Sequence, residues 1–433
     1  MIQSKSRRAF LQTAGAAGIP LGNEPAPATP PQPGGIRAEI FSRQRHLIVD
    51  YYRIRRKLAY PLPVRSLSIP ALPVPSIDDY PRSIRMLWAL EERINVLGWA
   101  AEWSGNAVYA RKAAADLEAL AAWPRYCQYD RPDLSSAHAG RLLWTAFTKW
   151  RWVQPALREK IRLACLRHVA EVAPKVDTHY AGLNSVKDFL SLPAPEAKLA
   201  NIPLIGTLGA ALTAAVSAHP ASELLNVKIF AAFGAVLQLR ERGFTEGVAY
   251  DHYILDFVAD WLQTIPARRR TAILDHPHFP EFLDQSYMLA APGAIEQVAE
   301  LSDVEPRQMP FHIAAQAKLA RIQPQPLRTW YLRHCRPDWL PSAALGALPE
   351  NLATLQAVAP RAGVLNAHSA CVLRTGWENE DLAVAHLQND NGTLVIGTRG
   401  EWIISDPGYQ QYMDDVEREF TLGRAKCAKK TSN

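Results

Sequence analysis

Residues 376–409 carry the pattern that most limits how this chain can fold. Apolar and polar residues alternate along the stretch, and Asn-Asp-Asn-Gly and Thr-Arg-Gly-Glu interrupt the alternation. A period of two is typical of strands, and these interruptions are typical of tight turns. The stretch therefore predicts three short strands joined by tight turns. Leu382, Val384 and His386 are expected to share one face of the first strand, because strand side chains alternate between faces.

Polar side chains gather at the ends of these strands. His386, Gln388 and Asp390 are two residues apart and are therefore expected to point the same way. Asp406 ends a later strand, directly before a Pro-Gly turn. Strands this apolar, with His, Gln and two Asp residues at their turns, indicate a functional site and not scaffold alone.

The stretch resembles the C-terminal β-sandwich of the heparinase II/III-like polysaccharide lyases. That family's pattern runs through a strand, His-x-(His/Gln)-x-Asp-x-Gly-(Ser/Thr), a second strand and Asp-Pro-Gly-Tyr. Residues 386–393 and 406–409 match it in order and spacing. A second match covers residues 242–253, a glycine-containing turn that opens a helix and in which the family presents its catalytic tyrosine. The resemblance extends over roughly residues 80–425.

Residues 82–298 show one helical pattern after another. In the first, apolar residues recur at intervals of three and four from Ile84 to Gly98, with Trp88 and Glu91 on the same stripe. Six further helices are expected at residues 110–122, 142–152, 156–173, 206–218, 225–240 and 253–262. Serial helices of this kind suggest an α/α toroid or solenoid. From about residue 361 the pattern changes to the alternation of strands.

The predicted fold is therefore α+β and multidomain. The resemblance implies an N-terminal incomplete α/α toroid over residues 82–305, followed over residues 306–433 by the beginning of an antiparallel β-sandwich. The family continues with His-Asn-Thr and further strands where this sequence has residues 426–433. We therefore expect the sandwich to be truncated, which leaves open whether this chain is active.

Two segments are expected ahead of the toroid. Residues 1–22 contain Ser-Arg-Arg-Ala-Phe-Leu before a short apolar run, which is similar to a twin-arginine export signal. This signal predicts a periplasmic or secreted protein. The apolar run is too short to span a bilayer, so no membrane span is expected. Residues 23–81 are rich in proline, which disfavours helix, and are expected to form a linker and an ordered wrap.

Composition adds little to this interpretation. The net charge of +6 over 433 residues suits an anionic polymer and is also a common solubility feature. With the resemblance above, we expect an anionic polysaccharide as the partner and no nucleic acid. Five cysteines, far apart and without a Cys-x-x-Cys pair, indicate neither a zinc finger nor a disulfide framework. The sequence does not predict the oligomeric state.

The resemblance implies an exported enzyme that cleaves a uronic-acid polysaccharide by β-elimination. Its catalytic residues would be Tyr250, His386 and Asn201. An amide or a protonated histidine beside the uronate carboxylate makes the adjacent C5 proton more acidic, as in an oxyanion site. Tyrosine and histidine can take or give the protons of the reaction when their pKa values are suitably placed.

These residues also have structural interpretations. Tyr250 would then pack its ring in a core and bond its hydroxyl to the backbone. Asn201 fits the N-cap of a helix that has Pro203 just inside it. Tyr180 and Asn184 form an alternative polar cluster to Asn201.

A metal is also implied by the resemblance. Members of the family hold a divalent ion, zinc in some, inside the sandwich. Residue by residue, two of its ligands fall on Gln388 and Asp406. An amide oxygen suits a harder cation such as calcium better than zinc, so both ions are candidates.

Two other functions fit the same sequence. A non-catalytic carbohydrate-binding relative would keep the cleft without a working tyrosine or histidine. A glycoside hydrolase on the same toroid would need a carboxylate pair across a cleft. Glu246 and Asp251 are the carboxylates available near the turn.

Overall fold

The structure is a computed structural model that describes residues 82–299, 311–335, 341–349, 351–367, 370–387 and 394–404. The chain divides into two compact units, residues 1–31 and 32–433, and every described residue belongs to the second. This unit combines many helices with a small antiparallel sheet, so the predicted α+β class is confirmed.

Helices dominate the described chain up to residue 288. They are α3 (Arg82–Ser104), α4 (Ala107–Ala121), α5 (Leu134–Lys149), α6 (Pro155–His179), α7 (Val186–Leu190), α8 (Asn201–Ser217), α9 (Ser222–Arg240), α10 (Val248–Trp261), α11 (Ala267–Leu274) and α12 (Phe279–Met288). All seven helices that periodicity predicts overlap one of these, so those predictions are confirmed. Short 3₁₀ segments, η2 (Pro195–Lys198) and η4 (Ser342–Ala344), complete the set used below.

Capping explains why helix α5 begins earlier than its apolar stripe. Helix α5 starts at Leu134 because Asp133 accepts a hydrogen bond from the Ser136 backbone N–H at 2.8 Å. The side chain of Ser136 in turn accepts from the Asp133 backbone, which completes a capping box. A cap of this kind adds a first turn whose residues need not follow the apolar spacing.

Helices α5 and α8 pack with their backbones in close approach. A Cβ atom at Gly209 would lie 2.5 Å from the Cα of Ala137, and one at Gly140 would lie 2.7 Å from the carbonyl oxygen of Gly209. Both distances are far below van der Waals contact, so only glycine fits at this crossing. The crossing fixes α5 and α8 at the centre of the helical core.

The chain continues through a two-stranded ribbon, two helices and a five-stranded sheet. These elements are β1 (Ala290–Ala291), β2 (Ala294–Val298), α13 (Phe311–Ile322), α14 (Pro326–His334), β3 (Gly363–Ala367), β4 (Ala370–Arg374), β5 (Leu382–Leu387), β6 (Leu394–Thr398) and β7 (Glu401–Ile404). The helical part thus extends beyond residue 305, where the sequence suggests a domain boundary, and α13 packs on α10.

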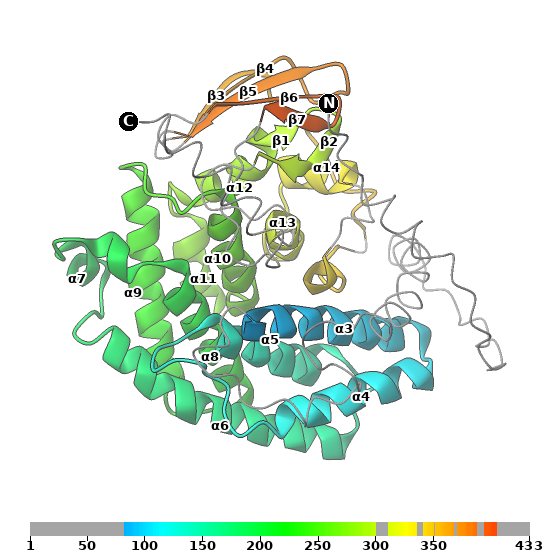
Figure 1. Ribbon diagram of the computed structural model, residues 1–433, viewed down its shortest axis with the longest axis vertical. Helices are drawn as coiled ribbons and strands as arrows, with labels where there is room; N and C mark the ends of the chain where they lie inside the picture. Colours follow the sequence, from blue (N-terminus) through cyan, green and yellow to red (C-terminus); the bar gives the residue numbers. More distant parts are fainter. Residues whose placement is uncertain are drawn as a thin grey trace. The chain divides into compact units, whose positions relative to one another are not determined.

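The five strands form an antiparallel meander in chain order (Figure 1). Strands β5, β6 and β7 are the three strands that residues 376–409 predict, and that prediction is confirmed. Val372, Ala385 and Val395 are fully buried in one cluster with side chains of α12, α13 and α14. The opposite face leaves large apolar side chains exposed. They are Val364, Leu373, Leu382, Leu394 and Ile404.

A buried arginine fastens the sheet to the end of α12. The Arg374 guanidinium donates to the carbonyl oxygens of Met288 at 2.8 Å and Ala290 at 2.6 Å. The indole of Trp377 donates to the Tyr287 carbonyl at 3.3 Å. Because the last carbonyls of a helix have no partner within it, these donors satisfy groups that burial would otherwise leave unpaired.

Helix α9 is long and apolar enough, by length and composition, to cross a membrane. Its side chains nevertheless belong to the helical core, since Ile229, Phe233 and Leu237 are fully buried there. The helix therefore has the character of a central core helix in this unit.

Candidate active site

The loop between α9 and α10 carries the second motif of the resemblance and is held from within. Buried Arg240 donates to the carbonyl of Phe244 at 3.0 Å and to the carboxylate of Asp251 at 2.6 Å. The hydroxyl of Thr245 donates to the same carboxylate. Gly247 has a φ of 90°, a backbone region that favours glycine. These bonds fix the position at which α10 begins.

Tyr250 lies in the first turn of α10, since that helix begins at Val248. Its side chain is 8% exposed and belongs to the main helical core. The neighbouring Val248 packs in the cluster that also contains Ala385 of strand β5. The turn that carries Tyr250 thus lies where the helical core meets the sheet.

Asn201 is not the N-cap of α8, so that prediction is wrong. Ala200 occupies the N-cap position, and Asn201 is the first helical residue. The Asn201 backbone N–H donates to the Glu246 carboxylate at 2.8 Å. A carboxylate from the α9–α10 loop thus satisfies an orphan donor of the helix and complements its dipole, a task that sequence alone assigns to the local side chain.

This bond brings Asn201 next to the loop that positions Tyr250. The Oδ1 atom of Asn201 is buried and, among the residues that the structure describes, finds no hydrogen-bond partner. An unsatisfied buried acceptor is unfavourable by about 1–3 kcal/mol. Asn201 therefore presents an amide that a bound molecule can satisfy.

His386 lies in β5, where Cys371 and Leu394 are its partners on the neighbouring strands. Strand alternation places it on the same face as Leu382 and opposite Ala385. Ala385 is the residue that packs toward the helical core, and Leu382 is exposed. The shared face that the sequence predicts is therefore the more exposed one, and the structure does not group His386 with Asn201.

The predicted metal ligands cannot be located. Gln388 and Asp406, together with Asp390, lie outside the described residues. Within the described ranges, no group of three or more His, Cys, Asp or Glu side chains is arranged to hold a metal ion.

The alternative polar cluster at Tyr180 and Asn184 binds a lysine. The ammonium of buried Lys228 donates to the Tyr180 carbonyl and to the Asn184 side-chain oxygen, both at 2.8 Å. These acceptors offset the desolvation of a buried charge. The cluster therefore has a structural role, which is to bind the buried ammonium of Lys228.

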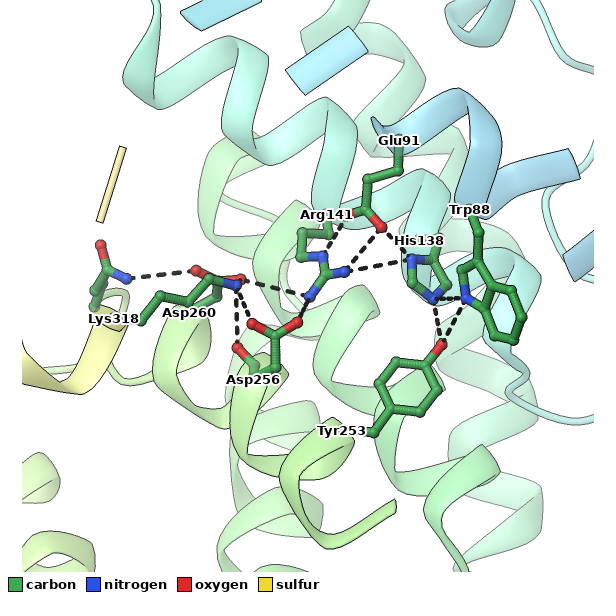
Figure 2. Close-up of polar contacts among 9 residues, drawn as sticks. Trp88, Glu91, His138, Arg141, Tyr253, Asp256, Asp260 and Lys318 are labelled. Atoms are coloured by element: carbon green, nitrogen blue, oxygen red, sulfur yellow. Dashed lines mark hydrogen bonds and ion pairs between the residues drawn. The ribbon is translucent and has the colours of Figure 1, made fainter. Parts of the chain in front are cut away.

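A buried network of charges that the sequence did not reveal joins four helices (Figure 2). Arg141 of α5 binds Glu91 of α3 through its Nε at 2.5 Å and contacts Asp256 of α10. Lys318 of α13 binds Asp256 at 2.6 Å and Asp260 at 2.5 Å. Because none of these groups is exposed, each charge depends on its partners for stability.

A Glu-His-Tyr relay forms one end of the network (Figure 2). His138 Nδ1 lies 2.5 Å from the Glu91 carboxylate, and its Nε2 contacts the hydroxyl of Tyr253. The indole N–H of Trp88 donates to the same Nε2 at 2.9 Å. Since a carboxylate only accepts, Nδ1 carries the proton and Nε2 accepts from both neighbours. Every polar atom of the imidazole is therefore satisfied.

The pKa shifts follow from this arrangement. Burial alone would raise the pKa of Glu91, but Arg141 and His138 outweigh it and hold that pKa well below its ordinary value. Burial lowers the pKa of His138, although Glu91 opposes the change. Burial also raises the pKa of Tyr253. The relay thus holds a carboxylate, a neutral imidazole and a neutral phenol. Because these groups lie on three different helices, their hydrogen bonds link α3, α5 and α10.

No protein-family model matches the chain, and no curated protein matches it.

Proposed function

We propose that this chain is a polysaccharide lyase that cleaves a uronic-acid polymer by β-elimination at the Asn201–Tyr250 region. Under this proposal the helices form an incomplete α/α toroid and the sheet is the first part of a β-sandwich. The supporting observation is the bond between Asn201 and Glu246, which joins an unsatisfied buried amide to the loop that positions Tyr250.

The reaction assigns one task to each residue. The Asn201 side chain donates from its Nδ2 atom to the uronate carboxylate, which lowers the barrier to removing the C5 proton, and its unsatisfied Oδ1 accepts from a hydroxyl of the sugar. Tyr250, as the phenolate, takes that proton, the electron pair left on C5 forms a C4–C5 double bond, and the bond from C4 to the glycosidic oxygen breaks. The leaving oxygen takes a proton from Tyr250 or from His386, which the resemblance implies as the second acid–base group. A divalent ion at Gln388 and Asp406 belongs to the same proposal, and no chemical step depends on it.

The two carboxylates near Tyr250 do not favour hydrolysis. Asp251 is buried and paired with Arg240 at 2.6 Å. Glu246 accepts from the α8 backbone at 2.8 Å. A glycosidase needs one carboxyl group free to protonate the leaving oxygen and another that faces water or the sugar. Both carboxylates already form hydrogen bonds that hold the α9–α10 loop in place, so neither is placed to act as this acid or base.

Exported protein that begins after the signal would be incubated with a panel of uronate polymers, and the absorbance of unsaturated product followed. We expect absorbance to rise with at least one polymer. Tyr250→Phe should reduce the rate by about 100-fold or more, the usual contribution of a general acid or base. Tyr109→Phe, which alters a half-buried tyrosine on α4, is the matched control and should change the rate less than about twofold.

Two results would contradict the proposal. Equal rates for Tyr250→Phe and Tyr109→Phe would remove Tyr250 from the chemistry. Polymer binding without unsaturated product, for the full chain on every polymer, would favour the carbohydrate-binding alternative. New reducing ends without that absorbance would favour hydrolysis.

A further inference from the structure

A cavity lies far along α10 from Tyr250. Its walls come from α3, α5, α10, α13 and the segment around η4. Its volume is about 40 Å³. Asp260, on its wall, follows Tyr250 by ten residues on the same helix, an axial rise of about 15 Å. The cavity is therefore separate from the proposed catalytic region.

Positive charge is in excess around this cavity. Its lining includes Arg141, Lys149, Lys318 and Arg321, whereas only Glu91 and Asp260 supply carboxylates, with Asp256 behind them. Four cations against at most three carboxylates leave at least one surplus positive charge. A pocket with this balance attracts an anion.

Two cations of the lining take no part in the ionic network, which itself carries one net negative charge, and together they give the region its surplus of one positive charge. Lys149 donates to the Gln263 side-chain oxygen at 2.6 Å and lies 4.7 Å from the centre of the Trp144 ring. Arg321 donates to the Gly346 carbonyl at 2.9 Å and is exposed at the mouth. Neither forms an ion pair with any carboxylate in the described part of the chain. Both are therefore able to bind an oxyanion.

An unsatisfied amide marks the inner wall. Asn95 of α3 is only 4% exposed, lines the cavity, and its Oδ1 has no hydrogen-bond partner within the described ranges. A buried acceptor of this kind is stabilised by a ligand that donates a hydrogen bond. Trp99 and Trp144 supply flat apolar walls beside it, a composition typical of small-molecule sites.

We propose that this cavity binds a small hydroxy acid of the sugar-acid class. The carboxylate binds between Lys149 and Arg321, and an adjacent hydroxyl donates to Asn95. The cavity holds about three water-sized atoms, so the hydroxyl that reaches Asn95 enters it, the carboxylate binds nearer the mouth, and the rest of the molecule extends outside. A single surplus charge favours a monoanion over a phosphate dianion. The site is independent of the reaction proposed at Tyr250.

The test is isothermal titration of the exported full-length protein with glucuronate, glucose and inorganic phosphate. We expect glucuronate to bind, glucose not to bind, and phosphate to bind more weakly than glucuronate. Lys149→Met and Arg321→Met should each weaken glucuronate binding by about tenfold or more, as expected for a lost charge-assisted hydrogen bond. Arg321 is exposed, so its variant tests the site even if Lys149→Met does not fold.

Two control variants separate this site from others. Lys160→Met removes an exposed lysine on α6 that pairs with Glu118, and it should leave binding unchanged. Asn201→Ala removes the amide that is proposed to bind a uronate at the catalytic region, and it should also leave glucuronate binding at the cavity unchanged, which distinguishes the two sites. Equal binding of phosphate and glucuronate, or binding that survives both Lys149→Met and Arg321→Met, would overturn the proposal. So would the absence of glucuronate binding.

Discussion

Glu91 tests whether the buried ionic network holds the helices together. Its carboxylate accepts from Arg141 at 2.5 and 2.9 Å and from His138 at 2.5 Å. Glu91→Gln preserves the shape but removes the charge, and it turns one acceptor into an amide donor. That donor then faces another donor, on Arg141 or on His138.

The expected loss of stability is large. Removing one partner of a buried ion pair destabilises a protein by about 3–5 kcal/mol, because the other charge stays buried. Arg141 keeps its contact with Asp256, so we expect the lower end of that range, about 3 kcal/mol. Such a loss is a large part of the 5–15 kcal/mol typical of a folded domain, so roughly a fifth to three-fifths of the stability would be lost.

Urea unfolding followed by circular dichroism measures this change, with the slope of the transition as a check that the same surface unfolds. Glu118→Gln is the matched control. Glu118 pairs with Lys160 at 2.8 Å, but both side chains are about half exposed. Exposed pairs contribute less than about 1 kcal/mol, so the control should barely shift the midpoint. Equal shifts for the two variants would refute the view that the network organises the fold.

Three further changes are predicted. Buried His168 has a pKa lowered to about 4 by burial, so unfolding takes up one proton between about pH 4 and 6.5 and stability falls on acidification; His168→Gln should make the measured free energy of unfolding depend less steeply on pH, by about 1.4 kcal/mol per pH unit. Tyr253→Phe should destabilise by only about 1 kcal/mol in urea, because Trp88 still donates to the relay histidine. Gly209→Ala should lower thermal stability by about 1–3 kcal/mol, since its Cβ would overlap Ala137; an unchanged melting temperature would contradict the close crossing.

Local pattern was enough to predict seven helices and the strands after residue 361, because apolar spacing follows directly from which face is buried. It did not predict α7, the helices from α11 to α14 or the β1–β2 ribbon, and it was not enough to choose between faces of the sheet. Leu382 and His386 do share a face, but the small residue Ala385 faces the core, so the apolar residues are the exposed ones. Within the described residues no element covers this face of the sheet, so apolar side chains on it stay exposed and hydrophobicity does not indicate burial there.

Partners far apart in sequence explain the other misses. Asn201 has the residue type of an N-cap, but Glu246, 45 residues later, satisfies the helix instead. Glu91 lies on the apolar stripe of its helix, and its partner His138 is 47 residues away. The one signal in the sequence was a charged residue within an apolar stripe. It indicates a buried charge but does not identify the residue that pairs with it.

The span of the ionic network also governs the order of folding. Asp256 and Asp260 lie one turn apart on α10, and the lysine that neutralises both is on α13, 58 residues beyond Asp260. During synthesis both carboxylates emerge well before Lys318, and only one earlier cation of the network, Arg141, can pair with Asp256 in the meantime. Two carboxylates and one cation remain unbalanced until α13 docks, so we expect the helical core to close late. Contacts this distant along the chain slow folding, and any fragment that ends before α13 would keep this part of the core open to water.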